Sequence, residues 1–112
     1  GIAEGVGVDV DVKSPSFTIS RLYETDQGLR FCHYDFYRLH DAGIMANDLH
    51  ETVSDAQAVT VVEWAAIVDG VLPVGRLTIE ITPSGELTRT LRISGLGEKN
   101  EHLMKGLHDF VA

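Results

Sequence analysis

The sequence contains one cysteine, Cys32, among 112 residues. A single thiol cannot form an internal disulfide, which excludes disulfide-stapled secreted scaffolds and fits a reducing cytoplasm. Long apolar runs are also lacking. The most apolar stretch, residues 56–74, is interrupted by two acidic residues, a glycine and a proline, and is therefore unsuited to cross a membrane. We expect a cytoplasmic protein without a membrane segment.

Basic residues are scarce in this chain. There are 9 lysines and arginines against 17 aspartates and glutamates, which gives a formal net charge of −8 at pH 7. This charge opposes non-specific attachment to nucleic-acid phosphates and to anionic lipid. We therefore expect that any RNA involved is held by partner proteins, and that this chain meets it only indirectly.

The overall composition is that of a globular protein. Hydrophobic residues make up 44% of the sequence and charged residues 23%, which separates it from the disordered class. A chain of this length can bury roughly two-thirds of the surface that its unfolded form exposes. We expect residues 1–112 to belong to a single domain with a real core.

The first part of the chain alternates between helical and β-prone segments. Residues 1–7 read as the end of a helix, because their glycines suit the left-handed conformations that stop one. Residues 16–24 and 28–35 are rich in β-branched and aromatic side chains and predict a β-hairpin. A short helix is predicted over 42–50. Residues 59–63 form a continuous apolar run, which is typical of a central strand.

The second part predicts a hairpin and a helix. Apolar and polar residues alternate over 77–82, and the same period continues over 87–93 beyond a Pro83-Ser84-Gly85 turn. Residues 98–111 predict a closing amphipathic helix with two glutamates in its first turn. These elements together indicate an α/β fold.

Two acidic residues close apolar, β-prone runs. Asp35 follows residues 31–34, and Glu63 follows residues 59–62. If the two runs are neighbouring parallel strands, both carboxylates emerge at the carboxyl edge of the sheet, where open α/β sheets bind ligands and metals. This is the geometry of a nucleotide-hydrolysing site.

Each of these carboxylates also has a plainer explanation. Asp35 could hold Mg²⁺ directly or through water, or it could cap the following turn or pair with Arg38. Glu63 could orient an attacking water, or it could simply end its strand. Trp64 could lie beside a ligand or belong to the core. Spacing alone leaves these alternatives open.

Three segments carry a resemblance to a known family. Ser14-Pro15-Ser16-Phe17, Asp35-Phe36-Tyr37-Arg38-Leu39 and Glu63-Trp64 occur in this order, and they resemble the TsaE (YjeE) family. That family is the bacterial P-loop ATPase of tRNA threonylcarbamoyladenosine synthesis. The resemblance covers residues 1–93. It departs from the family pattern at Phe36, where leucine is common, and at Ser16, where threonine is usual.

The resemblance implies a fold, a function and partners. The fold would be a three-layer P-loop NTPase-like α/β type with a mixed sheet. The intact protein would bind and hydrolyse ATP with Mg²⁺ and would act with TsaB and TsaD in modifying the adenosine next to the tRNA anticodon.

The resemblance also implies roles for individual residues. Asp35 would bind the metal, and Glu63 would serve the attacking water and the metal. Ser16 would contact nucleotide in a switch-like segment, although a serine at this place could also just cap the extended segment that Ser-Pro begins. Trp64 would pack near the phosphates. Arg38 would support Asp35 or face a partner protein.

One family hallmark does not occur in the sequence. A P-loop needs the string Gly-x-x-x-x-Gly-Lys-Ser/Thr to cradle phosphates. The nearest approach, residues 95–99, has the wrong spacing and no hydroxyl after the lysine. We therefore expect a fragment that lacks the first strand and the P-loop, is inactive alone, and self-associates through an exposed sheet edge.

Two other classes of function remain. One is a non-enzymatic interaction module in which both carboxylates are incidental. The other is a metal-dependent hydrolase built on His33, Asp35 and Glu63. A separate zinc hypothesis groups His33, His40 and His50 with Asp35. Cys32 alternates with His33 along its strand, so we expect its thiol on the opposite sheet face, as a buried structural residue.

Overall fold

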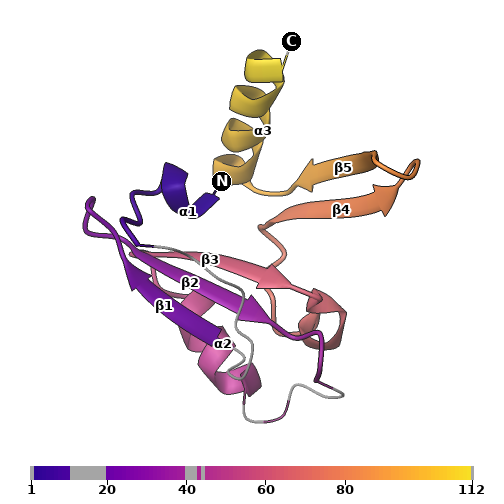
Figure 1. The fold of residues 1–112 in the computed structure, drawn as a ribbon. Helices are drawn as coiled ribbons and strands as arrows, with labels where there is room; N and C mark the ends of the chain where they lie inside the picture. Colours follow the sequence, from indigo (N-terminus) through magenta and orange to yellow (C-terminus); the bar gives the residue numbers. More distant parts are fainter. Residues whose placement is uncertain (1, 11–19, 40–42, 44, 112) are drawn as a thin grey trace. The chain divides into compact units, whose positions relative to one another are not determined.

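The computed structural model of the chain describes residues 2–10, 20–39, 43 and 45–111 (Figure 1). The chain divides into two compact units, Gly1–Leu72 and Pro73–Ala112. A compact unit can be part of a larger domain, so the single domain expected from the sequence stays a prediction. Across the described ranges, every helix is too short or too polar to cross a lipid bilayer.

A three-stranded mixed sheet forms the centre of the first unit (Figure 1). Its strands are β1 (Ser20–Glu24), β2 (Arg30–Asp35) and β3 (Ala58–Glu63), in the order β1-β2-β3. β1 pairs antiparallel with β2, and β2 pairs parallel with β3. The mixed sheet expected from the sequence is confirmed.

The β1–β2 hairpin is closed by a turn with specific chemistry. The Thr25 hydroxyl donates to the Leu29 carbonyl oxygen at 2.7 Å and accepts from the Leu29 amide at 3.0 Å. Gly28 has φ +77°, a conformation that glycine adopts without steric cost. The predicted hairpin is therefore confirmed from Ser20 onwards, while residues 16–19 lie outside the described part.

The helix α1 (Ile2–Gly5) precedes the sheet along the chain. It ends where the sequence predicts, and Gly7 has φ +88°. The Gly7 carbonyl accepts a hydrogen bond of 3.2 Å from the Asp26 amide, which joins this segment to the β1–β2 turn.

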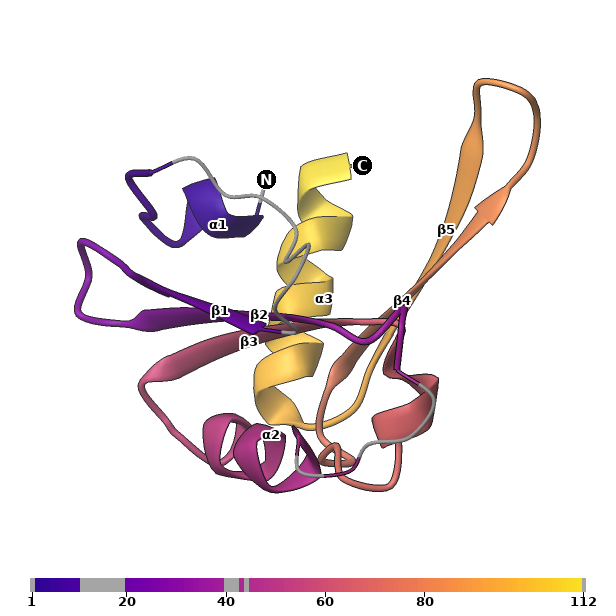
Figure 2. The same cartoon turned by 60° about the horizontal axis from the view of Figure 1, so that its bottom comes forward.

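The helix α2 (Met45–Val53) packs against one face of the sheet (Figure 2). Leu49 is fully buried at its centre, and Val53, one turn later, packs on the same core. Because this apolar spacing continues, the helix runs beyond His50, the end predicted from the sequence. The buried core combines β2, α2 and the turn after β3, and its members are Cys32, Tyr34, Phe36, Leu49 and Val68.

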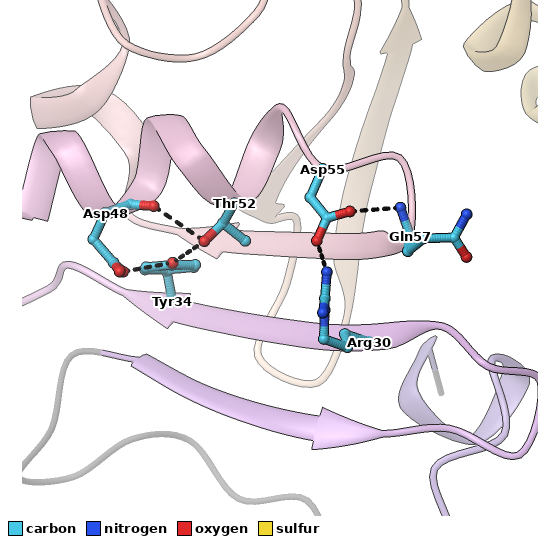
Figure 3. A network of polar contacts seen from close by, with 6 residues as sticks. All are labelled: Arg30, Tyr34, Asp48, Thr52, Asp55 and Gln57. Carbon is cyan, nitrogen blue, oxygen red and sulfur yellow. Dashed lines mark hydrogen bonds and ion pairs between the residues drawn. The ribbon is translucent and has the colours of Figure 1, made fainter.

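A polar network fastens α2 to the sheet (Figure 3). The Tyr34 hydroxyl donates to Asp48 Oδ2 at 2.8 Å and lies 2.8 Å from the Thr52 hydroxyl. Beyond the end of the helix, Asp55 forms an ion pair with Arg30. Buried hydroxyls need such partners because an unpaired one costs about 1–3 kcal/mol.

Ionisation of Tyr34 lowers the stability of this fold at alkaline pH. Burial raises the pKa of Tyr34 to about 12 from its ordinary value of about 10. The unfolded chain therefore releases this proton first, and the stability contributed by neutral Tyr34 is lost as pH rises from about 10 to about 12.

We expect Tyr34→Phe to lower the free energy of unfolding by about 1 kcal/mol at pH 8 through the lost hydrogen bonds. The difference between the two proteins should narrow between pH 10 and pH 12, because only the wild type loses stability through this group. Urea unfolding at several pH values measures it. A difference that stays constant over the range would contradict the assignment.

The second unit is a hairpin followed by a helix. β4 (Leu77–Pro83) pairs antiparallel with β5 (Arg89–Gly95), and α3 (Glu98–Val111) begins shortly after β5. The bounds predicted for this helix are confirmed. The second strand, expected from Leu87, begins at Arg89 instead, and Leu87 is 95% exposed. Ser84 and Thr88 bond across the turn, which places Leu87 inside the turn.

Candidate functional site

The carboxyl ends of β2 and β3 lie side by side. Asp35 is the register partner of Glu63 in the parallel pair, and the Phe36 amide donates to the Glu63 carbonyl oxygen at 3.1 Å. The prediction that these two runs are neighbouring parallel strands is confirmed. Both carboxylates therefore leave the sheet at one edge, which is where open α/β sheets place their ligand sites.

Asp35 is held by the turn that follows it. Its Oδ1 accepts a hydrogen bond of 3.0 Å from the Tyr37 amide, which is the capping contact expected of a strand-end aspartate. A carboxylate offers about four lone-pair positions on two oxygens. The cap fixes the orientation of Asp35 and is compatible with a second role for the same group as a cation ligand.

Glu63 is bonded to a histidine of the neighbouring strand. Glu63 Oε2 lies 2.7 Å from His33 Nε2, and the side chains are 45% and 11% exposed. His33 precedes Asp35 by two positions in β2, so His33 and Asp35 belong to the same sheet face. The sequence predicts these three residues as metal ligands but does not predict the direct bond between His33 and Glu63. The alternation along β2 places His33 on the same face as Asp35, and the register of β2 with β3 is also needed to bring His33 to Glu63.

Trp64 begins the turn after β3 with an unusual backbone. Its φ of 57° and ψ of 51° are left-handed, and it precedes a 3-10 turn, η1 (Ala65–Val68). Such a conformation in a bulky residue costs on the order of 1–3 kcal/mol, and strained residues of this kind cluster at functional sites.

The Trp64 side chain lies outside the core. It is 63% exposed, which contradicts the alternative that it is a core residue. Its ring faces that of Tyr37, which follows β2, with centroids 4.9 Å apart and planes at 49°. Two exposed aromatic rings therefore stand next to the pair of carboxylates.

Arg38 and Ser16 are the remaining predicted site residues. Arg38 is exposed in the turn after β2. Ser16, the predicted nucleotide contact, lies outside the described residues, as does His40. The role predicted for each stays a prediction.

The zinc alternative finds no ligand set in the described part of the chain. Within residues 2–10, 20–39, 43 and 45–111, no three histidine, cysteine or acidic side chains are grouped as a metal site. His33 Nε2 is already engaged by Glu63, and His50 is exposed on α2.

Cys32 lies on the opposite face of β2 from His33. Its side chain is 4% exposed and belongs to the core with Tyr34 and Leu49, as predicted for a structural thiol. Burial raises the pKa of the Cys32 thiol, which keeps it protonated and unreactive.

Comparison with known proteins identifies the family of this chain. The family model described as "Threonylcarbamoyl adenosine biosynthesis protein TsaE" matches residues 1–91. The chain belongs to the TsaE family. The resemblance seen in the three sequence segments is thereby confirmed.

Two curated relatives share the family name. A Bacillus subtilis (strain 168) protein named "tRNA threonylcarbamoyladenosine biosynthesis protein TsaE" is 36% identical over 115 aligned positions, which cover 100% of this chain and 70% of the relative. A Streptomyces coelicolor protein of the same name is 34% identical over 88% of this chain and 70% of its own length.

A solved structure of a TsaE-type protein supports the fold. The crystal structure of Bacillus YdiB matches with a TM-score of 0.72 and 30% identity, over 98% of this chain and 66% of that one. The fold class predicted from the sequence, an α/β P-loop NTPase-like fold with a mixed sheet, is confirmed. This chain spans slightly less than two thirds of the solved TsaE-type chain.

Proposed function

We propose that this chain belongs to a protein that binds and hydrolyses ATP in the biosynthesis of tRNA threonylcarbamoyladenosine. The observation that carries the proposal is the register of Asp35 opposite Glu63 at the carboxyl edge of two parallel strands, in a member of the TsaE family. The names of both curated relatives support the pathway.

Asp35 and Glu63 both offer carboxylate oxygens, the ligands that Mg²⁺ prefers alongside phosphate oxygens. Glu63 would contribute little to the affinity for the ion, because its main task is the attacking water. Asp35 would hold the ion, with its side chain kept in place by the Tyr37 amide. When bound, Mg²⁺ would neutralise charge on the phosphates.

Glu63 would act on the attacking water. Phosphoryl transfer asks a protein mainly for positioning and charge stabilisation. A half-exposed carboxylate at the end of β3, beside Asp35, can accept a hydrogen bond from water and orient it. Trp64 and Ser16 would contribute nucleotide contacts, and Arg38 would support Asp35 or face a partner.

The net charge of this chain and its family together suggest protein partners. With a net charge of −8, this chain is poorly suited to bind tRNA by itself. TsaB- and TsaD-type proteins would form the complex in which tRNA is modified, and the ATPase would support its turnover. The cytoplasm is the compartment that this pathway and a lone thiol imply.

The test uses the full-length gene product. We expect MgATP to change Trp64 fluorescence on binding and to be hydrolysed, as measured by phosphate release. Trp64→Phe is the control that assigns the emission. Residues 1–112 contain no P-loop string, whose backbone amides and lysine bind phosphates, and they should therefore bind MgATP far more weakly when tested alone. A full-length protein that neither binds nor hydrolyses MgATP would contradict the proposal.

A non-enzymatic docking module is the second candidate. In the described part of the chain β3 pairs only with β2, so its other edge carries unpaired backbone groups that can bind another strand. This edge also underlies the expected self-association. If the gene product binds TsaB- or TsaD-type partners but no nucleotide, this candidate replaces the ATPase.

A further inference from the structure

We propose that His33 is a positioning residue that holds the carboxylate of Glu63 for ATP hydrolysis. The inference rests on the proposed function and adds to it a residue that acts through Glu63. Its basis is the bond between His33 Nε2 and Glu63 Oε2, which joins the middle of β2 to the end of β3.

The bond restrains a side chain that would otherwise be mobile. Glu63 is 45% exposed at a strand end, and an exposed glutamate samples several rotamers, whose loss on ordering costs up to about 2 kcal/mol. His33 is 11% exposed and its ring has little freedom. At 2.7 Å the contact has the length of a charge-assisted hydrogen bond. The buried ring therefore fixes an exposed carboxylate in one orientation.

Packing alone does not explain a histidine at this place. His33 lies between Phe31 and Asp35 on one face of β2, and its exposed fraction is 8% when the backbone is included. Its Nδ1 is buried and finds no hydrogen-bond partner within residues 2–10, 20–39, 43 and 45–111. An unpaired buried nitrogen of this kind lowers stability. The ring also lies beside that of Phe31, with centroids 6.4 Å apart, and in the described part of the chain its polar contact is the one with Glu63.

The chemistry of the pair assigns different tasks to the two carboxylate oxygens. An ionised Glu63 accepts from His33, so Nε2 carries the hydrogen, and in the neutral ring Nδ1 is then bare. With Oε2 held by His33, Oε1 is the oxygen available to a water molecule. The efficiency of general-base catalysis depends on such alignment, because misplacement of a catalytic group by about 1 Å can cost about 100-fold in rate.

Two isosteric variants separate this role from a structural one. The side-chain nitrogen of His33→Gln lies near the position of Nε2 and can still donate to Glu63. The side-chain nitrogen of His33→Asn lies near the position of Nδ1 and does not reach Glu63. Both variants are polar and uncharged, and both place an amide in the same buried space.

In the full-length gene product, we expect His33→Asn to lower kcat by about 10- to 100-fold, the usual cost of removing a residue that supports a functional ligand. MgATP affinity, measured by Trp64 fluorescence, should not change. His33→Gln should recover most of kcat. Equal kcat in wild type and His33→Asn, or an equal loss of affinity and kcat in both variants, would overturn the proposal.

A spectroscopic measurement covers the case in which a variant fails to fold. In the ¹⁵N-histidine spectrum of the wild type, His33 should show the tautomer with hydrogen on Nε2, and Glu63→Ala should shift that nitrogen and leave the other histidines unchanged. An unshifted Nε2 would overturn the proposal. A wild type without ATP hydrolysis would remove the proposed function and this role together, whereas an active wild type with an unimpaired His33→Asn would remove only the role of His33.

Discussion

Replacing Glu63 with alanine is expected to abolish ATP hydrolysis by the full-length gene product while leaving MgATP affinity nearly unchanged. A group that orients or deprotonates the attacking water acts mainly in the transition state, so its loss appears in kcat and little in binding. General-base contributions of this kind amount to about 10²- to 10⁴-fold in rate. Phosphate release and Trp64 fluorescence measure the two quantities in the same protein.

Glu24 provides the matched control for this experiment. It also closes a strand with an exposed carboxylate, but β1 runs antiparallel, and Glu24 pairs with Arg30 at the opposite end of the sheet. Glu24→Ala removes the same charge and should leave kcat unchanged. If Glu63→Ala keeps wild-type turnover, Glu63 is only the end of its strand and the proposed mechanism is wrong. If both variants lose activity, the effect is one of general charge or stability.

Local patterns predicted most of the elements because they reflect short-range physics. The alternation over 77–82 gave β4, and the glutamates and apolar spacing of 98–111 gave both ends of α3. The helix α2 was harder to delimit. Its last turn depends on the contact of Val53 with the core around Leu49, which only the folded chain supplies.

The candidate site was predictable in part for a similar reason. Asp35 and Glu63 were predictable because each is an acidic residue at the end of an apolar run. The parallel pairing of β2 and β3 brings the two together. The bond from His33 to Glu63 required the strand register, since His33 lies opposite Val61 and reaches Glu63 diagonally. The left-handed backbone of Trp64 had no local signal, because tryptophan does not favour positive φ.

Asp35 offers the clearest separation between a metal ligand and a turn cap. Asp35→Asn keeps an acceptor for the Tyr37 amide and removes only the charge, whereas Asp35→Ala removes both. If Asp35 holds Mg²⁺, both variants should lose MgATP affinity and turnover together. Mutation of groups that merely support a metal ligand costs about 10- to 100-fold in metal affinity, so we expect about 100-fold for the carboxylate itself.

The decisive measurement is nucleotide affinity with and without magnesium. The loss should appear with Mg²⁺ and disappear when the ion is chelated, because only the metal-bound complex uses the carboxylate. Thermal unfolding of the same variants reports the cap: Asp35→Ala should be less stable than Asp35→Asn through the lost bond to Tyr37. If Asp35→Asn behaves like the wild type in affinity and turnover and only Asp35→Ala is impaired, Asp35 is a turn cap, and the metal would have to be held by other residues.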